Sequence, residues 1–540
     1  MASRRGAAGP TGTLGAYRSS LQRPKGCHDS PVDVVTMTVL REYLVEAVSR
    51  HGDRPAVVDR GRTWTYRELL AAAASAARHL QDLGAEAGTP VALLMHNRVE
   101  YLVADLAVAM LGAAKVPLNT MLSAQEHAYM LRDSGARICL AERELWTAAE
   151  QAADGPLDAT AILVEDGAWQ AVVSGAPIDK PGPVADDDHG VIMYTGGTTG
   201  RPKGVVHTQR SLAMNLLSHL LEMDLHADDV LLLTSPLPHS AGFLAQAALT
   251  RGATVHLEQR FDPAAVVDRI ERDRITYLFL VPTMIYRLLD EISGRASFDG
   301  TSVRTILYGA APITTERLRQ GLATFGPVFV QLYGQTEAPN FITRLRRDDH
   351  RVDPGREHRL RSCGQPVLMT QVRIHREDGS ECPAGEVGEV TARTPYTTVG
   401  YLNRPKETGE ALRDGWLHTG DLGYVDEDGF LYLVDRKKDM IITGGLNVYT
   451  AEVERGLSQI PGVREVCVVG VPHPDWGEAV VAYVVAEPEA DLTPEKVMAG
   501  ARDRLTSYKR PKAVVMTDRL PTTAVGKIDK KALRDRWPGW

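Results

Sequence analysis

A loop rich in glycine and threonine is the segment best suited to bind a polyphosphate. Glycines let backbone N–H groups approach an anion closely, threonine hydroxyls add donors, and a lysine adds positive charge. The loop is not a Walker A motif, because Lys203 follows Pro202 and no GxxxxGK[ST] register fits. As generic composition, such a loop is more often a simple turn. The segment reads Tyr194-Thr195-Gly196-Gly197-Thr198-Thr199-Gly200-Arg201-Pro202-Lys203-Gly204.

Five further segments combine carboxylates, hydroxyls, histidine or lysine with glycine or proline. With the loop, they resemble, in order, the signature motifs of the adenylate-forming superfamily, which includes acyl-CoA synthetases, adenylation domains of nonribosomal peptide synthetases, and beetle luciferases. The resemblance covers about residues 38–535, and six motifs in one order argue against a chance match. The segments are Leu237-Pro238-His239-Ser240, Tyr333-Gly334-Gln335-Thr336-Glu337-Ala338, Trp416-Leu417-His418-Thr419-Gly420-Asp421, Asp435-Arg436-Lys437-Lys438-Asp439 and Pro521-Thr522-Thr523-Ala524-Val525-Gly526-Lys527.

This resemblance implies that the loop holds the β- and γ-phosphates of ATP. Glu337 would hold Mg²⁺, with Thr195 as a second candidate. One carboxylate suffices, because magnesium prefers oxygen ligands and keeps waters and phosphate oxygens around it. Taken alone, Glu337 would be a surface carboxylate. The phosphate-binding candidates are Thr195, Gly196, Gly197, Thr198, Thr199, Gly200 and Lys203.

The resemblance also indicates which residues would bind the adenylate. Tyr333 would stack on adenine, Thr336 would donate to the α-phosphate, and Asp421 would accept hydrogen bonds from both ribose hydroxyls, since a carboxylate can accept two donors at once. Lys527 would stabilise negative charge that develops during adenylation, and His239 would lie near the acyl carboxylate. The catalytic candidates are therefore Lys527, His239, Thr336 and Glu337, and the remaining nucleotide-binding candidates are Gly309, Ala310, Ala311, Gly334, Gln335 and Arg436.

For the second chemical step, the resemblance implies that a small C-terminal domain swings about a hinge, so that one cleft performs two reactions. Lys438 would be the pivot. Gly444 and Gly445 would line the path of the pantetheine arm of coenzyme A, because glycine permits close approach. Leu446 replaces a charge that is common in the family.

The expected function is that of an ATP-dependent acyl-CoA ligase, which converts a carboxylic acid and ATP to acyl-AMP and pyrophosphate and then transfers the acyl group to CoA. Residues 236–243 contain no Asp to hold a substrate amine, which disfavours amino acids. Other readings stay open: a free-acid enzyme that loads a carrier-protein phosphopantetheine, a luciferase-like oxidative enzyme, an enzyme of one half-reaction, and a binding protein with a decayed site.

The helix and strand signals around these residues predict an α/β fold. Asp262-Pro263 marks a helix start. Near-continuous apolar strands separated by helices indicate parallel sheets covered by helices on both faces. After Cys363, short alternating strands with Asp-Gly turns predict an antiparallel, barrel-like subdomain, and a small mobile α+β domain follows. The strand candidates are 230–233, 275–281, 303–308 and 328–333, and the Asp-Gly turns are 378–379, 414–415 and 428–429.

The domain boundaries follow from changes in strand pattern and charge along the chain. We expect a disordered leader over 1–36, an N-terminal adenylate-forming domain over 37–434, a hinge over 435–439 and a C-terminal lid domain over 440–540. An ordered N-terminal arm and a solvated hairpin turn at 435–439 are the alternatives.

Composition excludes several classes of protein. A chain of 540 residues exceeds one compact core, and a net charge of -8 argues against a broad nucleic-acid surface. Five scattered cysteines without a CxxC pair argue against a disulfide framework or structural zinc and favour a reducing cytoplasm. The most apolar run, residues 101–118, is interrupted by Asp105 and Lys115, so no membrane span is expected. A homodimer is compatible with the sequence.

Overall fold

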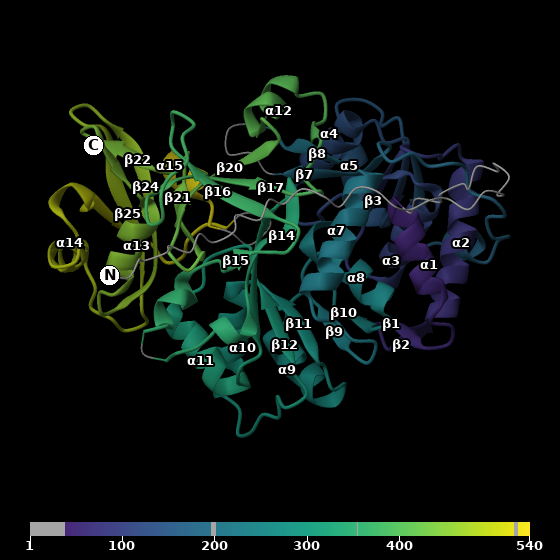
Figure 1. Ribbon diagram of the computed structural model, residues 1–540, viewed down its shortest axis with the longest axis horizontal. Helices are drawn as coiled ribbons and strands as arrows, with labels where there is room; N and C mark the ends of the chain where they lie inside the picture. The colour runs from purple at the N-terminus through teal and green to yellow at the C-terminus, as the bar shows by residue number, and fades with distance from the viewer. Residues whose placement is uncertain (1–37, 196–200, 354, 523–527) are drawn as a thin grey trace, which may run out of the picture. The chain divides into compact units, whose positions relative to one another are not determined.

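Helices and strands alternate along the chain, as the apolar segments predict (Figure 1). The computed structural model describes residues 38–195, 201–353, 355–522 and 528–540. The leader expected over 1–36 lies outside the described residues, and so do Gly196, Gly197, Thr198, Thr199, Gly200 and Lys527.

The first sheet has the strand order β15-β14-β13-β12-β11-β9-β10-β1-β2. Its central strands run parallel, whereas β2, β14 and β15 pair antiparallel at the two edges. Its strands are β1 (Pro55–Asp59), β2 (Arg62–Thr65), β9 (Val230–Leu233), β10 (Thr254–Leu257), β11 (Tyr277–Leu280), β12 (Thr305–Tyr308), β13 (Phe329–Gln335), β14 (Ala338–Leu345) and β15 (Gln365–Pro366).

The second sheet has the order β18-β8-β7-β4-β3-β5-β6. Strands β3 to β7 pair in parallel, and β8 and β18 extend the sheet antiparallel. The strands are β3 (Pro90–Leu94), β4 (Ala114–Pro117), β5 (Ile138–Ala141), β6 (Thr160–Leu163), β7 (His189–Thr195), β8 (Lys203–Thr208) and β18 (Gly400–Tyr401).

Helices fill the space between the two sheets and cover their outer faces (Figure 1). One core cluster joins Leu44, Leu106 and Leu244 of three helices to Leu93 of β3 and Leu231 of β9, so these helices lie between the sheets. The inner helices are α1 (Leu40–Ser49), α2 (Tyr66–Asp82), α3 (Val99–Leu111), α7 (Gln209–Glu222) and α8 (Gly242–Arg251). The outer helices are α9 (Pro263–Arg272), α10 (Pro282–Ser293) and α11 (Thr315–Phe325) on the first sheet and α4 (Ala124–Ser134) and α5 (Arg143–Ala152) on the second.

A third, antiparallel sheet follows, with the order β16-β17-β20-β19 and β21 paired to β20. Ile374, Val390 and Leu417 from this sheet pack with Tyr333 and Ile342 of the first sheet. The expected barrel-like subdomain is therefore present as a half-barrel-like antiparallel sheet that covers β13 and β14. Its elements are β16 (Gln371–His375), β17 (Gly388–Arg393), α12 (Pro405–Ala411), β19 (Leu412–Arg413), β20 (Trp416–Val425) and β21 (Leu431–Arg436).

The C-terminal domain has a sheet of order β23-β22-β25-β24, with β26 paired to β25. Helices α13 and α14 contribute Val453 and Val497 to the core on one face, and α15 contributes Leu533 to the other. Its elements are β22 (Ile441–Thr443), β23 (Leu446–Val448), α13 (Thr450–Ser458), β24 (Val463–His473), β25 (Gly477–Ala486), α14 (Pro494–Arg502), β26 (Ala513–Met516) and α15 (Lys530–Asp535). The remaining short elements of the chain are α6 (Gly167–Val173), η1 (Leu237–Ala241), η2 (Arg347–Asp349), η3 (Glu357–Arg361) and η4 (Ser507–Lys509).

The elements that were predicted from local sequence signals are present in the structure. The Asp262 carboxylate accepts a hydrogen bond from the N–H of Ala265 at 2.9 Å, and α9 begins at Pro263. The four strand candidates contain β9, β11, β12 and β13. Asp414 and Gly415 have φ values of 51° and 76° and join β19 to β20, because a two-residue hairpin turn of this kind needs positive φ at both positions.

Two charges that interrupt the most apolar segment pair with each other in the core. Lys115 of β4 places Nζ 2.6 Å from Oδ1 of Asp105 on α3, and both side chains are less than a tenth exposed. The amide of Gln246 on α8 donates to Oδ2 of Asp105 at 2.9 Å. The buried carboxylate is thus compensated, as burial of a charge requires.

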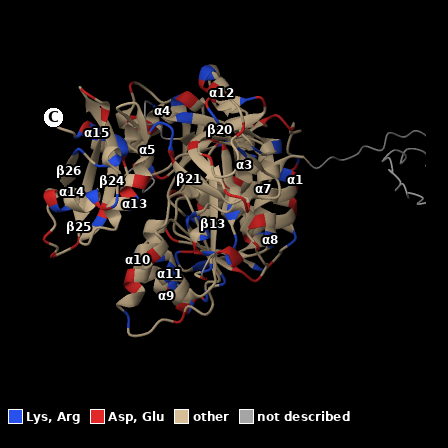
Figure 2. Cartoon of the chain, turned by 60° about the vertical axis from the view of Figure 1, so that its left-hand side comes forward, with Lys and Arg blue, Asp and Glu red and all other residues tan. Residues whose placement is uncertain are grey.

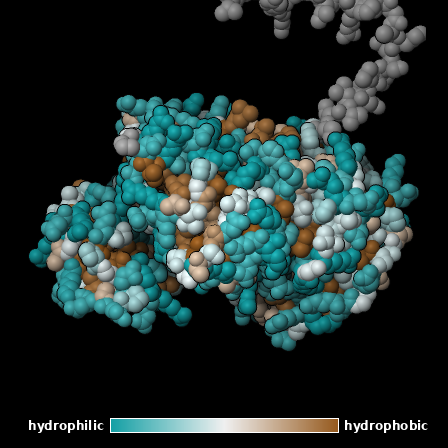
Figure 3. Space-filling view, turned by 90° about the horizontal axis from the view of Figure 1, so that it is seen from below, coloured by the Kyte–Doolittle hydropathy of each residue, from teal (hydrophilic) through white to brown (hydrophobic). Residues whose placement is uncertain are grey.

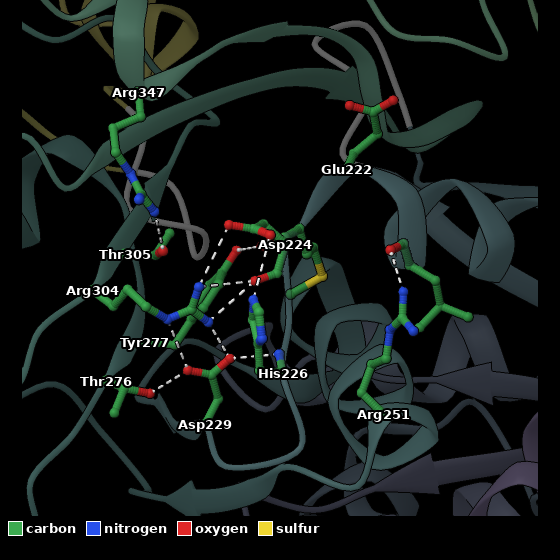
Figure 4. Close-up of polar contacts among 12 residues, drawn as sticks. Glu222, Asp224, His226, Asp229, Arg251, Thr276, Tyr277, Arg304, Thr305 and Arg347 are labelled. Atoms are coloured by element: carbon green, nitrogen blue, oxygen red, sulfur yellow. Dashed lines mark hydrogen bonds and ion pairs between the residues drawn. The ribbon is translucent and has the colours of Figure 1, made fainter.

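A polar network joins the starts of β9, β11 and β12 (Figure 4). Asp229, 3% exposed, accepts a hydrogen bond from the Thr276 hydroxyl at 2.7 Å and forms an ion pair with Arg304. Arg304 also donates to the backbone carbonyl of Asp224 at 3.1 Å. Ligands of parallel α/β sheets bind at the carboxyl ends of the strands, so this network at the amino ends stabilises the sheet.

The surface carries both signs of charge and few large apolar areas. Lys and Arg residues are interspersed with Asp and Glu along the helices, strands and loops (Figure 2), and the face shown in Figure 3 is mostly hydrophilic with small hydrophobic areas. Within the described ranges, no helix combines the length and apolar composition needed to cross a bilayer.

Removing one partner of the buried pair should destabilise the fold. Asp105→Leu leaves the Lys115 ammonium buried without a counter-charge, so we expect the free energy of unfolding to fall by about 3–5 kcal/mol in urea titrations followed by circular dichroism. The double variant Asp105→Leu/Lys115→Met should recover most of that loss, because an apolar pair replaces the ion pair. Equal destabilisation of the single and double variants would contradict this account.

Candidate active site

The stem of the glycine-rich loop is an antiparallel pair of strands. Thr195 ends β7 and Lys203 begins β8, and the two residues are directly paired. The β-branched run Val205-Val206 before His207-Thr208 is the sequence signal for β8. Helix α7 begins directly after this strand, because the Thr208 hydroxyl caps it by accepting from the N–H of Ser211 at 3.2 Å.

Glu337 lies beside this stem. Its Oε1 accepts a hydrogen bond from the hydroxyl of Tyr401 at 2.7 Å, and Nζ of Lys203 lies 5.1 Å from the centroid of the Tyr401 ring. Tyr401 belongs to β18, which pairs with β8. Burial and the neighbouring carboxylate raise the pKa of Tyr401, so its hydroxyl stays protonated and donates. Sequence reasoning missed Tyr401, since no local pattern marks it.

A buried histidine fixes the segment 333–338 to the loop stem. Nε2 of His207, which is 1% exposed, lies 2.8 Å from the backbone carbonyl of Thr336. Burial lowers the pKa of His207 to about 4, so the ring is neutral at physiological pH and Nε2–H donates. The second sheet therefore determines where Thr336 and Glu337 lie.

Asp421 is the second centre of the site. Its Oδ2 accepts hydrogen bonds from the Tyr333 hydroxyl and the Gln335 amide, both at 2.7 Å, and its Oδ1 lies 3.0 Å from Nε of Arg436. Asp421 is 4% exposed. Burial, and then the Asp421 carboxylate, raise the pKa of Tyr333. Because Oδ1 has a single partner among the described residues, it retains a lone pair for a further donor such as a ribose hydroxyl.

A hollow of about 310 Å³ opens beside Asp421. Three cations contribute to its wall, which suits an anion such as a phosphate. The residues that line it are Thr419, Gly420, Arg436, Lys437 and Lys438.

Two predicted glycines are required by close backbone approach. A Cβ on Gly309 would lie 2.5 Å from the carbonyl oxygen of Leu332, and one on Gly334 would lie 2.7 Å from the backbone nitrogen of Asn340. Ala310, between Gly309 and Ala311, has φ +67°. Residues 309–311 follow β12 and residues 333–337 include the last residues of β13, so both candidate segments come from the carboxyl ends of neighbouring parallel strands.

His239 lies on η1, after β9, with an extended backbone (φ -116°, ψ -146°) inside the turn. Asn340 supports this turn, because its Nδ2 lies 3.4 Å from the carbonyl of Ser240 and 2.8 Å from Nε2 of His219. Burial lowers the pKa of His219 to about 4, and its Nδ1–H donates to the carbonyl of Asn215. The turn that holds His239 is thus joined to β14 and α7 by a buried polar chain that the sequence did not reveal.

Gly444 and Gly445 have a local structural reason for being glycine. Their φ values are 57° and 78°, and they form the turn between β22 and β23. Gly444 donates its N–H to the carbonyl of Trp476 within the C-terminal domain. Their role along the pantetheine path stays a prediction, as does the pivot role of Lys438.

The described residues contain no group of three or more His, Cys, Asp or Glu side chains that could hold a metal by themselves. A magnesium ion would therefore depend on phosphate oxygens in addition to Glu337. The chemistry of the donors fits, because Oε2 of Glu337 has no partner among the described residues and Thr195 and Lys203 lie on the neighbouring stem.

The structure thus brings the described site candidates into two neighbouring clusters. Thr195, Lys203, Thr336 and Glu337 gather at the loop stem, and Tyr333, Gln335, Asp421 and Arg436 gather beside the hollow. Gly444 and Gly445 lie in the C-terminal domain.

Comparison with known proteins agrees with this arrangement. A family model described as AMP-binding enzyme matches residues 44–402, and a model of the AMP-binding enzyme C-terminal domain matches residues 452–527. The medium/long-chain-fatty-acid–CoA ligase FadD8 of Mycobacterium tuberculosis is 38% identical over 518 residues, covering 92% of this chain and 90% of that protein. Feruloyl-CoA synthase of an Amycolatopsis species is 40% identical over 484 residues, covering 89% and 96%.

A solved structure extends the likeness to three dimensions. The amide bond synthetase McbA from Marinactinospora thermotolerans superposes with a TM-score of 0.83 at 32% identity, covering 92% of this chain and 99% of that one. The expected fold class is confirmed. This chain therefore belongs to the AMP-binding enzyme family, the adenylate-forming superfamily that its motifs resemble, and is most like the acyl-CoA ligases.

Proposed function

We propose that this protein is an ATP-dependent acyl-CoA ligase. The observation that carries the proposal is the buried Asp421 carboxylate, held by Tyr333, Gln335 and Arg436 beside a cation-lined hollow. Such a carboxylate suits a ribose, and the cations suit the phosphate attached to it. The loop stem with Lys203 and Glu337 would receive the β- and γ-phosphates.

In the first step, a carboxylate oxygen of the acid attacks the α-phosphorus of ATP, the bond to the pyrophosphate oxygen breaks, and pyrophosphate leaves. Thr336 donates to the α-phosphate, and Lys527 neutralises developing charge. Such reactions depend mainly on positioning and electrostatics. Magnesium, when bound, neutralises phosphate charge. Here Glu337 would hold the cation, and the hydrogen bond from Tyr401 orients Glu337.

In the second step, the sulfur of CoA attacks the acyl carbonyl, the bond to the AMP oxygen breaks, AMP leaves, and the thiol proton passes to solvent. We assign this step to rotation of residues 440–540 about the hinge 435–439, with Lys438 as pivot and residues 37–434 as the body. Gly444 and Gly445 would line the thiol path.

The acid is proposed to be of medium size or bulky and to bind in an apolar pocket. The candidate pocket segments 239–242, 282–284 and 308–312 consist mainly of small or apolar residues. The relatives named above are a medium/long-chain-fatty-acid–CoA ligase and a feruloyl-CoA synthase, and the acids in both names are of at least medium size.

The function is tested by acid-dependent pyrophosphate exchange into ATP, followed by product analysis with CoA, an apo-carrier protein, a phosphopantetheinylated carrier protein and simple amines. We expect exchange with medium- or long-chain fatty acids or with cinnamic-type acids, and acyl-CoA as the main product. Strong selectivity for acetate would refute the proposed acid class. Amide or acyl-carrier products formed in preference to acyl-CoA would refute CoA as the acyl acceptor.

Ribose recognition by Asp421 predicts an altered response to 2′-deoxyATP. The wild type should use ATP better than 2′-deoxyATP by roughly tenfold or more in kcat/KM, as expected for one hydrogen bond to a charged group. In Asp421→Asn, we expect the ratio of the two kcat/KM values to fall towards one. A variant that stays folded and keeps the full ratio would remove Asp421 from ribose binding.

The hydrogen bond from Tyr401 to Glu337 predicts a magnesium effect. Tyr401→Phe should raise the Mg²⁺ concentration for half-maximal pyrophosphate exchange about tenfold, because a residue that orients a metal ligand typically contributes that much to affinity. Tyr424→Phe is the matched control, because Tyr424 stacks on Tyr432. Identical magnesium curves for the wild type and both variants would argue against the orienting role of Tyr401.

A further inference from the structure

Asp435 belongs by its backbone to the sheet that holds Asp421. It lies on β21, where it pairs with Leu422 of β20, the residue after Asp421. Its side chain, however, reaches the C-terminal domain. The carboxylate accepts hydrogen bonds from the N–H of Thr450 and from the Thr450 hydroxyl, the latter at 3.1 Å. Because Thr450 is the first residue of α13, the carboxylate also compensates the positive end of that helix.

The contact continues through a buried hydroxyl to a lysine. Thr450 is fully buried, and its Oγ1 donates to Asp435 while accepting from Nζ of Lys530 at 2.5 Å. Lys530 also pairs with Glu454 of α13 at 3.0 Å. The Thr450 hydroxyl thus acts both as a donor and as an acceptor. Lys530 donates to Thr450, and Thr450 donates to Asp435, so the three side chains form one continuous hydrogen-bonded chain.

Lys530 begins α15, three residues after the catalytic candidate Lys527. The flanks of the intervening segment are held together, because Thr522 and Ile528 form a β-bridge and the N–H of Asp529 donates to the carbonyl of Pro521 at 2.8 Å. Through Thr450 and Lys530, the carboxylate of Asp435 therefore connects the flank of the catalytic loop to the sheet that carries Asp421.

This side-chain connection crosses the proposed pivot, whereas the ion pair of Asp439 does not. Asp435 precedes Lys438, and Thr450 and Lys530 follow it. Asp439 pairs with Arg534 at 2.7 Å, but both of these residues follow the pivot. Rotation about Lys438 would separate Asp435 from Thr450 and would leave the pair of Asp439 and Arg534 intact.

We propose that Asp435 is a positioning residue that stabilises the orientation of the C-terminal domain used for adenylation, through Thr450 and Lys530. The inference rests on the proposed function and on Lys438 as pivot. A contact present in one orientation and absent in the other shifts the equilibrium between them. Its loss should therefore slow one half-reaction selectively, which a purely structural role would not do.

The test compares Asp435→Ala with Asp439→Asn in the full chain. Pyrophosphate exchange reports adenylation, and single-turnover transfer from a synthetic acyl-adenylate to CoA reports thiolation. We expect Asp435→Ala to slow exchange about tenfold and to leave thiolation unchanged or faster, as a shifted two-state equilibrium requires. Asp439→Asn should change the two rates by the same factor. Equal loss in Asp435→Ala, or a selective loss of thiolation, would overturn the proposal.

A second readout does not depend on catalysis. Arg436, Lys437 and Lys438 are exposed and are trypsin sites. Limited proteolysis under native conditions should cut Asp435→Ala at these residues several times faster than the wild type, because the restraint on the hinge is lost. Asp439→Asn should resemble the wild type, with thermal melts showing that both variants are folded. If Asp435→Ala were cleaved at the same rate as the wild type, the proposal for Asp435 would be overturned. If the wild type activated no acid, only the proposed function would be refuted, because the proteolysis readout does not depend on catalysis.

Discussion

The carboxylate of Asp421 must be compensated where it is buried, and this requirement joins three parts of the molecule. Tyr333 and Gln335 come from β13 of the first sheet, Asp421 from β20 of the antiparallel sheet, and Arg436 from the end of β21. A buried charge without partners costs several kcal/mol. The antiparallel sheet is therefore held on β13 by polar contacts as well as by the packing of Ile374, Val390 and Leu417.

Around this centre, the site follows the geometry of parallel sheets. The loop stem includes the end of β7, the His239 turn follows β9, residues 309–311 follow β12, and residues 333–337 lie at the end of β13. Carboxyl ends of parallel strands form the edge where ligands bind. Two sheets contribute to one site here, and His207 joins them through the carbonyl of Thr336. The loop stem and the cluster around Asp421 are thereby placed relative to each other.

Much of this could be predicted from the sequence, because the relevant information is local. Apolar runs between turn residues predicted β9, β11, β12 and β13, and Asp262-Pro263 predicted the start of α9, since strand formation and capping depend on neighbours in the chain. The motif series predicted the family, which the comparisons confirmed. The charged run at 435–439 suggested a hinge, although its first two residues lie within β21.

The sequence by itself thus determined the secondary elements, the family and which residue types are available for phosphate, ribose and thiol chemistry. Only the tertiary structure decided their partners. Tyr401 lies 64 residues from Glu337, His207 lies 129 residues from Thr336, and Lys530 lies 80 residues from Thr450. Such pairs form only when packed sheets and helices bring distant segments together, and no periodicity or local motif records that event. The same reason explains why Asp435, a hinge residue by its sequence, proved to bind the first turn of α13.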